Sequence, residues 1–179
     1  MTVKANLSSL VNRSSLVNLS SLVVGYGNPL RGDDGIGWVI AERLADDPRM
    51  AGVEVVACHQ LTPELALDVS RVDLVVLVDA RSGPPAGTVA VERVDAAGAN
   101  GTTWSHHISP ASLVALAREL YGRAAKVRVV SVEAGSLDVG ENLSPLVQAA
   151  ADRAVDAIAE LVLRAADAGR QPVAEIGHA

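Results

Sequence analysis

The chain has 179 residues, of which 49% are hydrophobic and 20% are charged, and its formal net charge is -6. This length and balance fit one globular domain with a substantial core. Aromatic residues make up only 2% of the chain and the net charge is negative, so base stacking and phosphate contacts are both disfavoured and we expect no nucleic-acid partner.

The cysteine content and the hydropathy pattern indicate the compartment. The single cysteine, Cys58, cannot form an internal disulfide and fits a reducing environment. No apolar run approaches the roughly 18 residues that a membrane span needs, and no secretory signal is evident near the N-terminus. We therefore expect a cytoplasmic protein without a membrane partner.

The N-terminal segment carries a six-residue repeat whose three copies begin at Asn6, Asn12 and Asn18. The third copy continues into Val23 and Val24, which predicts the first core strand. We divide the chain into a repetitive extension without function at residues 1–17, a single α/β domain at 18–166, and a C-terminal tail at 167–179.

Downstream of the repeat, strand-like apolar stretches alternate with stretches of helical spacing. Further strands are expected at residues 53–57, 72–78, 88–94 and 126–132. Helices are expected at residues 34–46, at 63–69 with Thr62 as N-cap, after the N-cap Ser109, and at 145–166. The run at 72–78, bounded by Asp79, is typical of a strand covered on both faces. Together these elements predict an α/β fold with a doubly wound sheet of about five strands and helices on both faces.

The first predicted strand leads through a glycine-rich turn into a helix, an arrangement that often binds phosphate. Here Asp33 and Asp34 occupy the position where the phosphate would lie. The two carboxylates suit the positive end of the helix dipole, but they would repel a phosphate. Leu30 also replaces the third glycine of the dinucleotide fingerprint. The turn therefore favours a cation.

Other polar residues follow strands or precede helices in the same way. Asp79 ends the third predicted strand, and His106 and His107 precede the helix that begins after Ser109. In a doubly wound sheet such positions meet in a crevice beyond the carboxyl ends of the strands. Carboxylate and imidazole ligands accept Ni²⁺, Zn²⁺, Mn²⁺ or Fe²⁺, and the spacing does not select among them.

Each candidate also has a purely structural interpretation. Asp33 is most simply a helix N-cap whose carboxylate accepts an N–H near Ile36. Asp34 can be favoured by the helix dipole alone, and Asp79 can be a turn former. One of the two histidines is expected to be exposed to solvent or to contact a metal ligand rather than the metal itself. The glycines of the first turn, Gly25 and Gly27, are expected to serve turn geometry rather than ligand contact.

These motifs resemble those of a known family. The pattern Gly25-x-Gly27-Asn28-Pro29-Leu30-x-x-Asp33-Asp34-Gly35-x-Gly37 is similar to the opening motif of the hydrogenase maturation proteases, which trim the C-terminal tail of the large subunit of [NiFe] hydrogenases. Similar segments follow in the same order at residues 59–65, 77–80, 105–110, 131–137 and 143–145. The resemblance covers residues 21–163.

The resemblance implies a three-layer α/β fold and a site of two acids and one histidine that reads nickel. The acids correspond to Asp34, where many members have Glu, and to Asp79. The histidine corresponds to His106, and a one-residue shift of the alignment would select His107 instead. His59 could reach the same crevice, but we do not expect it to be a ligand.

The implied function is that of an endopeptidase. It would remove the C-terminal extension of a [NiFe] hydrogenase large-subunit precursor after nickel insertion, with Asp34, Asp79 and His106 as catalytic and metal-contacting residues. Nickel would come with the precursor rather than remain bound to the enzyme. The sequence has no Gly-x-Ser-x-Gly elbow and no His-Glu-x-x-His motif, so hydrolysis would use a water activated by metal or carboxylate.

Three alternatives remain at this stage. The protein could be a metallohydrolase with its own bound metal that acts on another substrate. It could be a nucleotide-binding α/β module that uses Gly25 and Gly27 as a phosphate turn. It could also be an inactive relative that only chaperones the precursor.

Overall fold

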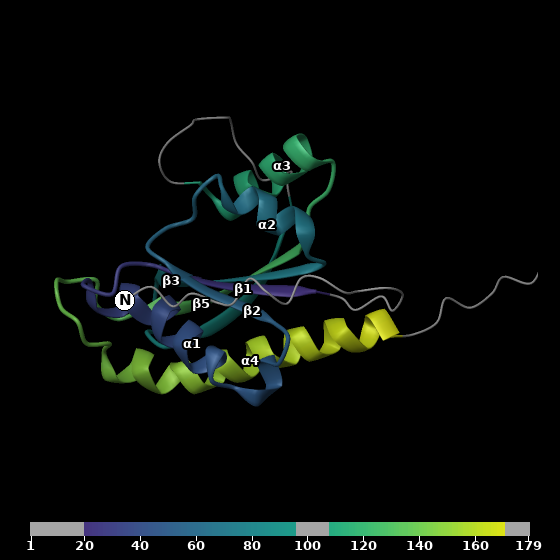
Figure 1. The fold of residues 1–179 in the computed structure, drawn as a ribbon. Helices are drawn as coiled ribbons and strands as arrows, with labels where there is room; N and C mark the ends of the chain where they lie inside the picture. The colour runs from purple at the N-terminus through teal and green to yellow at the C-terminus, as the bar shows by residue number, and fades with distance from the viewer. Residues whose placement is uncertain (1–19, 96–107, 171–179) are drawn as a thin grey trace, which may run out of the picture.

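A single five-stranded sheet forms the centre of the molecule (Figure 1). The computed structural model describes residues 20–95 and 108–170. The strands are β1 (Ser21–Tyr26), β2 (Glu54–Cys58), β3 (Leu74–Ser82), β4 (Val89–Val94) and β5 (Lys126–Ala134). Their order is β2-β1-β3-β5-β4; β4 lies antiparallel to β5 at one edge, and the other pairs are parallel.

Helices cover both faces of this sheet. The α-helices are α1 (Ile36–Ala45), α2 (Leu65–Arg71), α3 (Pro110–Tyr121) and α4 (Pro145–Arg170), and the short 3₁₀ helices are η2 (Gly32–Gly35) and η3 (Pro48–Met50). Figure 1 shows α2 and α3 on one face and α1 and α4 on the other. The predicted three-layer α/β fold is therefore confirmed.

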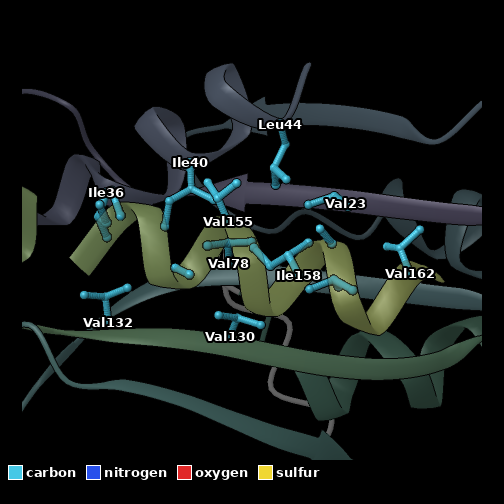
Figure 2. Packing of buried hydrophobic residues seen from close by; sticks show 14 of the residues in the cluster. Val23, Ile36, Ile40, Leu44, Val78, Val130, Val132, Val155, Ile158 and Val162 are labelled. Carbon is cyan, nitrogen blue, oxygen red and sulfur yellow. The ribbon is translucent and has the colours of Figure 1, made fainter. Parts of the chain in front are cut away.

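The buried side chains form two clusters, one on each face of the sheet. Val76 and Val78 of β3 pack toward α1 and α4, where Ile40 and Ile158 lie in the same cluster (Figure 2). Their strand neighbours, such as Leu77, pack toward α2 and α3. Side chains alternate between the faces of a strand, so a strand that is buried on both faces needs a continuous apolar run. The β3 sequence satisfies this requirement.

β3 is longer than the sequence predicts. We expected the strand to end at Val78, but it continues to Ser82, and its parallel pairing with β5 runs on through Asp79 opposite Ser131 and Ser82 opposite Ala134. Asp79 is therefore a strand residue whose backbone is held by the sheet, and not a turn former. The pairing with β5 explains the difference, because the polar end of β3 is stabilised by backbone hydrogen bonds rather than by an apolar side-chain pattern.

The N-cap of α3 agrees with the sequence, whereas α1, α2 and α4 differ from their predicted bounds, α1 beginning at Ile36 rather than at residue 34. The hydroxyl of Ser109 accepts the N–H of Ser112 at 3.1 Å, which confirms the predicted N-cap of α3. α2 begins at Leu65, and its N-cap position is Glu64, so the prediction that Thr62 caps this helix was wrong. α4 extends to Arg170, beyond residue 166, where we expected it to end.

No helix in the described ranges 20–95 and 108–170 is long and apolar enough to cross a membrane.

Candidate functional site

The helix that follows β1 lies directly against the sheet because glycines remove side chains from the contact. A Cβ on Gly25 would lie 2.0 Å from the carbonyl oxygen of Gly37, and a Cβ on Gly37 would lie 2.8 Å from the carbonyl oxygen of Val78. Gly27 has a φ of 134°, which L-residues rarely adopt. These glycines serve backbone geometry, as predicted, and they bring η2 and the start of α1 close to the end of β3.

Asp33 is not the helix N-cap that the local sequence suggests. Its side chain makes no cap hydrogen bond, and the residue is 0% exposed. Instead, its Oδ2 accepts the N–H groups of Gly135 at 2.7 Å and Ser136 at 2.9 Å, together with the hydroxyl of Ser144 at 2.8 Å. Its Oδ1 accepts the N–H of Ser144 at 2.6 Å. The carboxylate thus ties η2 to the segment between β5 and α4.

These contacts determine the protonation state of Asp33. Burial alone would raise the pKa of the carboxyl group, but the hydrogen bonds from Ser144, Ser136 and Gly135 outweigh it and lower the pKa. The carboxyl group of Asp33 therefore favours its ionised form, which these hydrogen bonds stabilise. The N–H of Asp33 also donates to the carbonyl of Ser136 at 3.0 Å, which holds the two segments together from both sides.

Asp34, the next residue of η2, is half-buried and lies closer to solvent. Its Oδ2 accepts the N–H of Asn28 at 2.8 Å, and its own N–H donates to the carbonyl of Arg31 at 3.1 Å. The turn at residues 28–31 therefore fixes the direction of the Asp34 carboxylate.

Asp79 lies near Asp34 at the carboxyl edge of the sheet. Burial, and then the negative charge of Asp34, raise the pKa of Asp79 to about 6, although hydrogen bonds from the Tyr26 hydroxyl and the Ala80 N–H act in the opposite direction. The structure therefore brings together two of the three residues that the sequence predicts for the site. The charge of Asp34 therefore disfavours the ionised form of Asp79.

Tyr26 is a site residue that the sequence analysis missed. Its hydroxyl donates to Asp79, and burial together with the charge of Asp79 raises the pKa of the phenol well above its usual range. The phenol therefore remains a hydrogen-bond donor at physiological pH. Strand alternation could have found it, because Tyr26 shares a face of β1 with Val24 and directly follows Gly25, which is paired with Val78.

Solved structures of known function have the same fold. The chain is 26% identical to the hydrogenase maturating endopeptidase HybD from E. coli over 81% of this chain and 93% of that one, with a TM-score of 0.66. It is 26% identical to the [NiFe] hydrogenase maturation protease HycI from Thermococcus kodakarensis KOD1 over the same shares, with a TM-score of 0.65. An endopeptidase from E. coli solved in solution is also 26% identical, over 85% of this chain and 95% of that one, with a TM-score of 0.66.

The chain is similar in fold and in sequence to hydrogenase maturation proteases. No protein-family model matches the chain, and no curated protein matches its sequence. The likeness to these proteases therefore rests on the fold, together with the motifs that lie on it.

The histidine expected in a hydrogenase maturation protease falls outside the described residues. Both His106 and its alternative His107 lie in residues 96–107, so the third part of the site stays a prediction from sequence. Within the described ranges, no group of three or more His, Cys, Asp or Glu side chains could hold a metal ion. Asp34 and Asp79 would need a further ligand to form such a group.

His59 and Cys58 lie at the end of β2, beside the same edge. The exposed His59 ring lies 5.2 Å from the ring of Trp38 at an interplanar angle of 50°. The indole N–H of Trp38 donates to the carbonyls of Gly27 at 2.9 Å and Cys58 at 3.0 Å, and so joins β1 and β2 to α1. Burial raises the pKa of the Cys58 thiol, which makes it a poor nucleophile.

Proposed function

We propose that the protein is an endopeptidase that removes the C-terminal extension of a [NiFe] hydrogenase large-subunit precursor after nickel has been inserted. Two findings support this proposal. The structural relatives are hydrogenase maturation endopeptidases and proteases, and two carboxylates lie together at the carboxyl edge of the sheet. Ligands of doubly wound sheets bind at this edge.

The observation that carries the proposal is the electrostatic coupling of Asp34 and Asp79. Two half-buried carboxylates repel each other at neutral pH, and the raised pKa of Asp79 reflects part of that cost. A divalent cation between them would remove the repulsion and stabilise both ionised groups. With His106 as a third ligand, the set of two oxygens and one nitrogen suits Ni²⁺.

In this proposal nickel is part of the substrate. The metal arrives in the precursor, and Asp34, Asp79 and His106 grip it, which places one scissile peptide bond against these groups. The metal then polarises the scissile carbonyl or activates a water molecule. Tyr26 donates a hydrogen bond to Asp79 and so helps to fix the direction of this ligand. Cleavage would thus depend on nickel loading.

The proposal is tested by substituting two of the three residues one at a time. Asp34→Asn and His106→Ala, mixed with nickel-loaded precursor, are each expected to abolish processing while circular dichroism shows an intact fold. Asp46→Asn is the matched control, because Asp46 is an exposed carboxylate at the other end of α1 and is expected to leave processing unchanged. Full processing by both site variants would refute the assignment. Stoichiometric metal in the purified enzyme would instead favour a metallohydrolase with its own metal.

A further inference from the structure

The segment between β5 and α4 contacts the turn that leads to Asp34 through main-chain bonds as well as through a carboxylate. The N–H of Gly32 donates to the carbonyl of Gly140 at 2.7 Å, and the N–H of Gly140 donates to the carbonyl of Leu30 at 3.0 Å. Gly32 has a φ of 51°, and a Cβ there would lie 3.1 Å from the carbonyl oxygen of Ser136. The turn and the segment are therefore joined at several points.

The far end of this segment is anchored in the core through α4. Ser144 directly precedes Pro145, the first residue of α4, and the N–H of Gln148 donates to the carbonyl of Ser144 at 2.8 Å. The first turns of the helix place Val147 and Ala150, both 0% exposed, in the cluster between α4 and the sheet. Because the packing of an apolar face supplies most of the stability of a helix in a protein, Ser144 is a firm point of attachment.

Asp33 joins this point of attachment to the site. Its carboxylate accepts two bonds from Ser144, at 2.6 Å from the N–H and 2.8 Å from the hydroxyl. Bonds to an ionised acceptor are roughly twice as strong as bonds between neutral groups. Asp33 is followed directly by Asp34, and both residues lie in η2, a 3₁₀ helix of four residues. A displacement of Asp33 would therefore displace Asp34 as well.

A main-chain amide reports where the Asp34 carboxylate lies. Oδ2 of Asp34 accepts the N–H of Asn28 at 2.8 Å across the turn. This bond forms only while the carboxylate keeps its position relative to the turn. The Asn28 amide is therefore a probe of the position of Asp34 that requires neither metal nor precursor.

We propose that Asp33 is a positioning residue, which fixes the place of the Asp34 carboxylate by attaching η2 to the N-terminal end of α4. The inference rests on the proposed function for what Asp34 then contacts, namely the nickel of the precursor. Asp33 itself is 0% exposed, and its carboxylate accepts four hydrogen bonds, so it acts through the residue that follows it. The segment between β5 and α4 thereby determines the geometry of the site from outside it.

Two variants weaken the attachment, and one control matches them elsewhere. Asp33→Asn keeps the size of the side chain but removes its charge and one acceptor oxygen. Ser144→Ala keeps the carboxylate and removes one of its donors. Ser70→Ala is the control, because the hydroxyl of Ser70, a buried residue in α2, also donates one bond, to the carbonyl of Leu67 at 2.6 Å.

The first readout is the NMR signal of the Asn28 amide in the free protein, as proton chemical shift and as hydrogen-exchange rate. Asp34→Ala gives both values in the absence of the acceptor. We expect Asp33→Asn to move the shift toward the Asp34→Ala value and to raise the exchange rate of this amide by about tenfold, as the loss of a hydrogen bond to a charged group implies. Ser144→Ala should act in the same direction with a smaller effect, and Ser70→Ala should match the wild type.

The second readout is kcat/KM for cleavage of nickel-loaded large-subunit precursor, expressed per folded molecule. Asp33→Asn should lower this value by about tenfold to a hundredfold, because a misplacement of about 1 Å costs a rate of this order. Ser144→Ala should lower it less, and Ser70→Ala should leave it unchanged. If Asp33→Asn does not fold, Ser144→Ala provides the test, since it keeps the buried anion.

The two readouts separate the positioning role from the proposed function. An unchanged Asn28 amide in every attachment variant that folds would overturn the positioning role, however much stability is lost. A displaced Asn28 amide with wild-type kcat/KM would also overturn it, because cleavage would then not depend on the position of Asp34. A displaced amide together with a wild type that cleaves no precursor would support the attachment of Asp34 and overturn the proposed function.

Discussion

The interior beneath α1 and α4 and the carboxyl edge of the same sheet differ in what they bury. In the described part of the chain, the buried cluster of the interior consists of apolar side chains such as Val76, Val78 and Ile158. The edge buries or half-buries the carboxylates of Asp33, Asp34, Asp79 and Glu133.

The two regions also differ in what their burial does to stability. Each apolar side chain in the interior contributes roughly 1.5–3 kcal/mol to the folded state. At the edge, desolvation and mutual repulsion oppose folding and are offset only where hydrogen bonds or cations are supplied. The burial of carboxylates at the edge of the sheet destabilises the fold, and the burial of apolar side chains in the interior offsets this cost.

Removing the best-satisfied carboxylate of the edge is expected to have the largest effect on stability. Asp33→Ala leaves three N–H groups and a hydroxyl without their acceptor, and we expect it to lower the free energy of unfolding by about 3 kcal/mol. Urea denaturation measures this loss. Ser144→Ala, which removes only the hydroxyl donor, serves as the partial control with an expected loss of about 1 kcal/mol. Equal, small losses for both would show that Asp33 does not hold the two segments together.

A truncation in the interior is expected to cost about as much stability without touching the site. Ile158→Ala opens a cavity against fully buried neighbours and should lower the free energy of unfolding by about 3 kcal/mol. Processing activity per folded molecule should remain at the wild-type level, because Ile158 packs on the α1 and α4 face of the sheet, whereas Tyr26, which bonds Asp79, packs with the cluster on the other face. Activity and urea unfolding are measured on the same sample, so that a loss of stability is distinguished from a loss of activity. A loss of specific activity would mean that the interior and the edge are coupled.

Neutralising Asp79 is expected to stabilise the protein. The folded pKa of about 6 exceeds the ordinary value of 3.8, so the folded state holds this proton more tightly than the unfolded chain does. The stability that comes from this proton is fully present below pH 3.8 and is lost as the pH rises through about 6. Asp79→Asn should therefore gain about 1–2 kcal/mol at pH 7 in metal-free buffer, after allowance for solvent screening of a half-buried group, and lose processing activity.

A pH series checks the sign of this effect. The difference in unfolding free energy between Asp79→Asn and the wild type should grow between pH 4 and 7. A difference that shrank over this interval would mean that the pKa of Asp79 is lowered in the folded protein.

The smallest predicted effect concerns the coupling within the carboxylate pair. Asp34→Asn removes the charge that contributes to the raised pKa of Asp79, so the pKa should fall below about 6. It should remain above its ordinary value, because burial is the larger cause. NMR titration of the Asp79 side-chain carboxyl carbon in both proteins measures the shift. An unchanged pKa would show that the two carboxylates do not interact.

The sequence predicted the parts of this molecule that depend on local pattern. The apolar run of β3, the Ser109 cap of α3 and the alternation of strands and helices each follow from neighbouring residues, and the structure contains them. The meeting of Asp34 and Asp79 was also predictable, because residues that follow parallel strands share one edge of the sheet.

The parts that the sequence did not predict depend on partners far away in the chain. Asp33 was interpreted as a local cap, whereas its donors lie 102 to 111 residues later, in the segment before α4. The polar end of β3 forms a strand only because β5 pairs with it, and the burial of Glu133 follows from the same pairing. Local propensity contains no information on such contacts. His106 remains a prediction, since it lies outside the described residues.

The most direct measurement compares a nickel-loaded and a nickel-free hydrogenase large-subunit precursor. Each is incubated with the purified protein, and the products are weighed by mass spectrometry. We expect the loaded form alone to lose a single C-terminal peptide, as our proposal that Asp34, Asp79 and His106 bind nickel requires. Equal cleavage of both forms would contradict nickel recognition, and cleavage of neither would contradict the protease function itself.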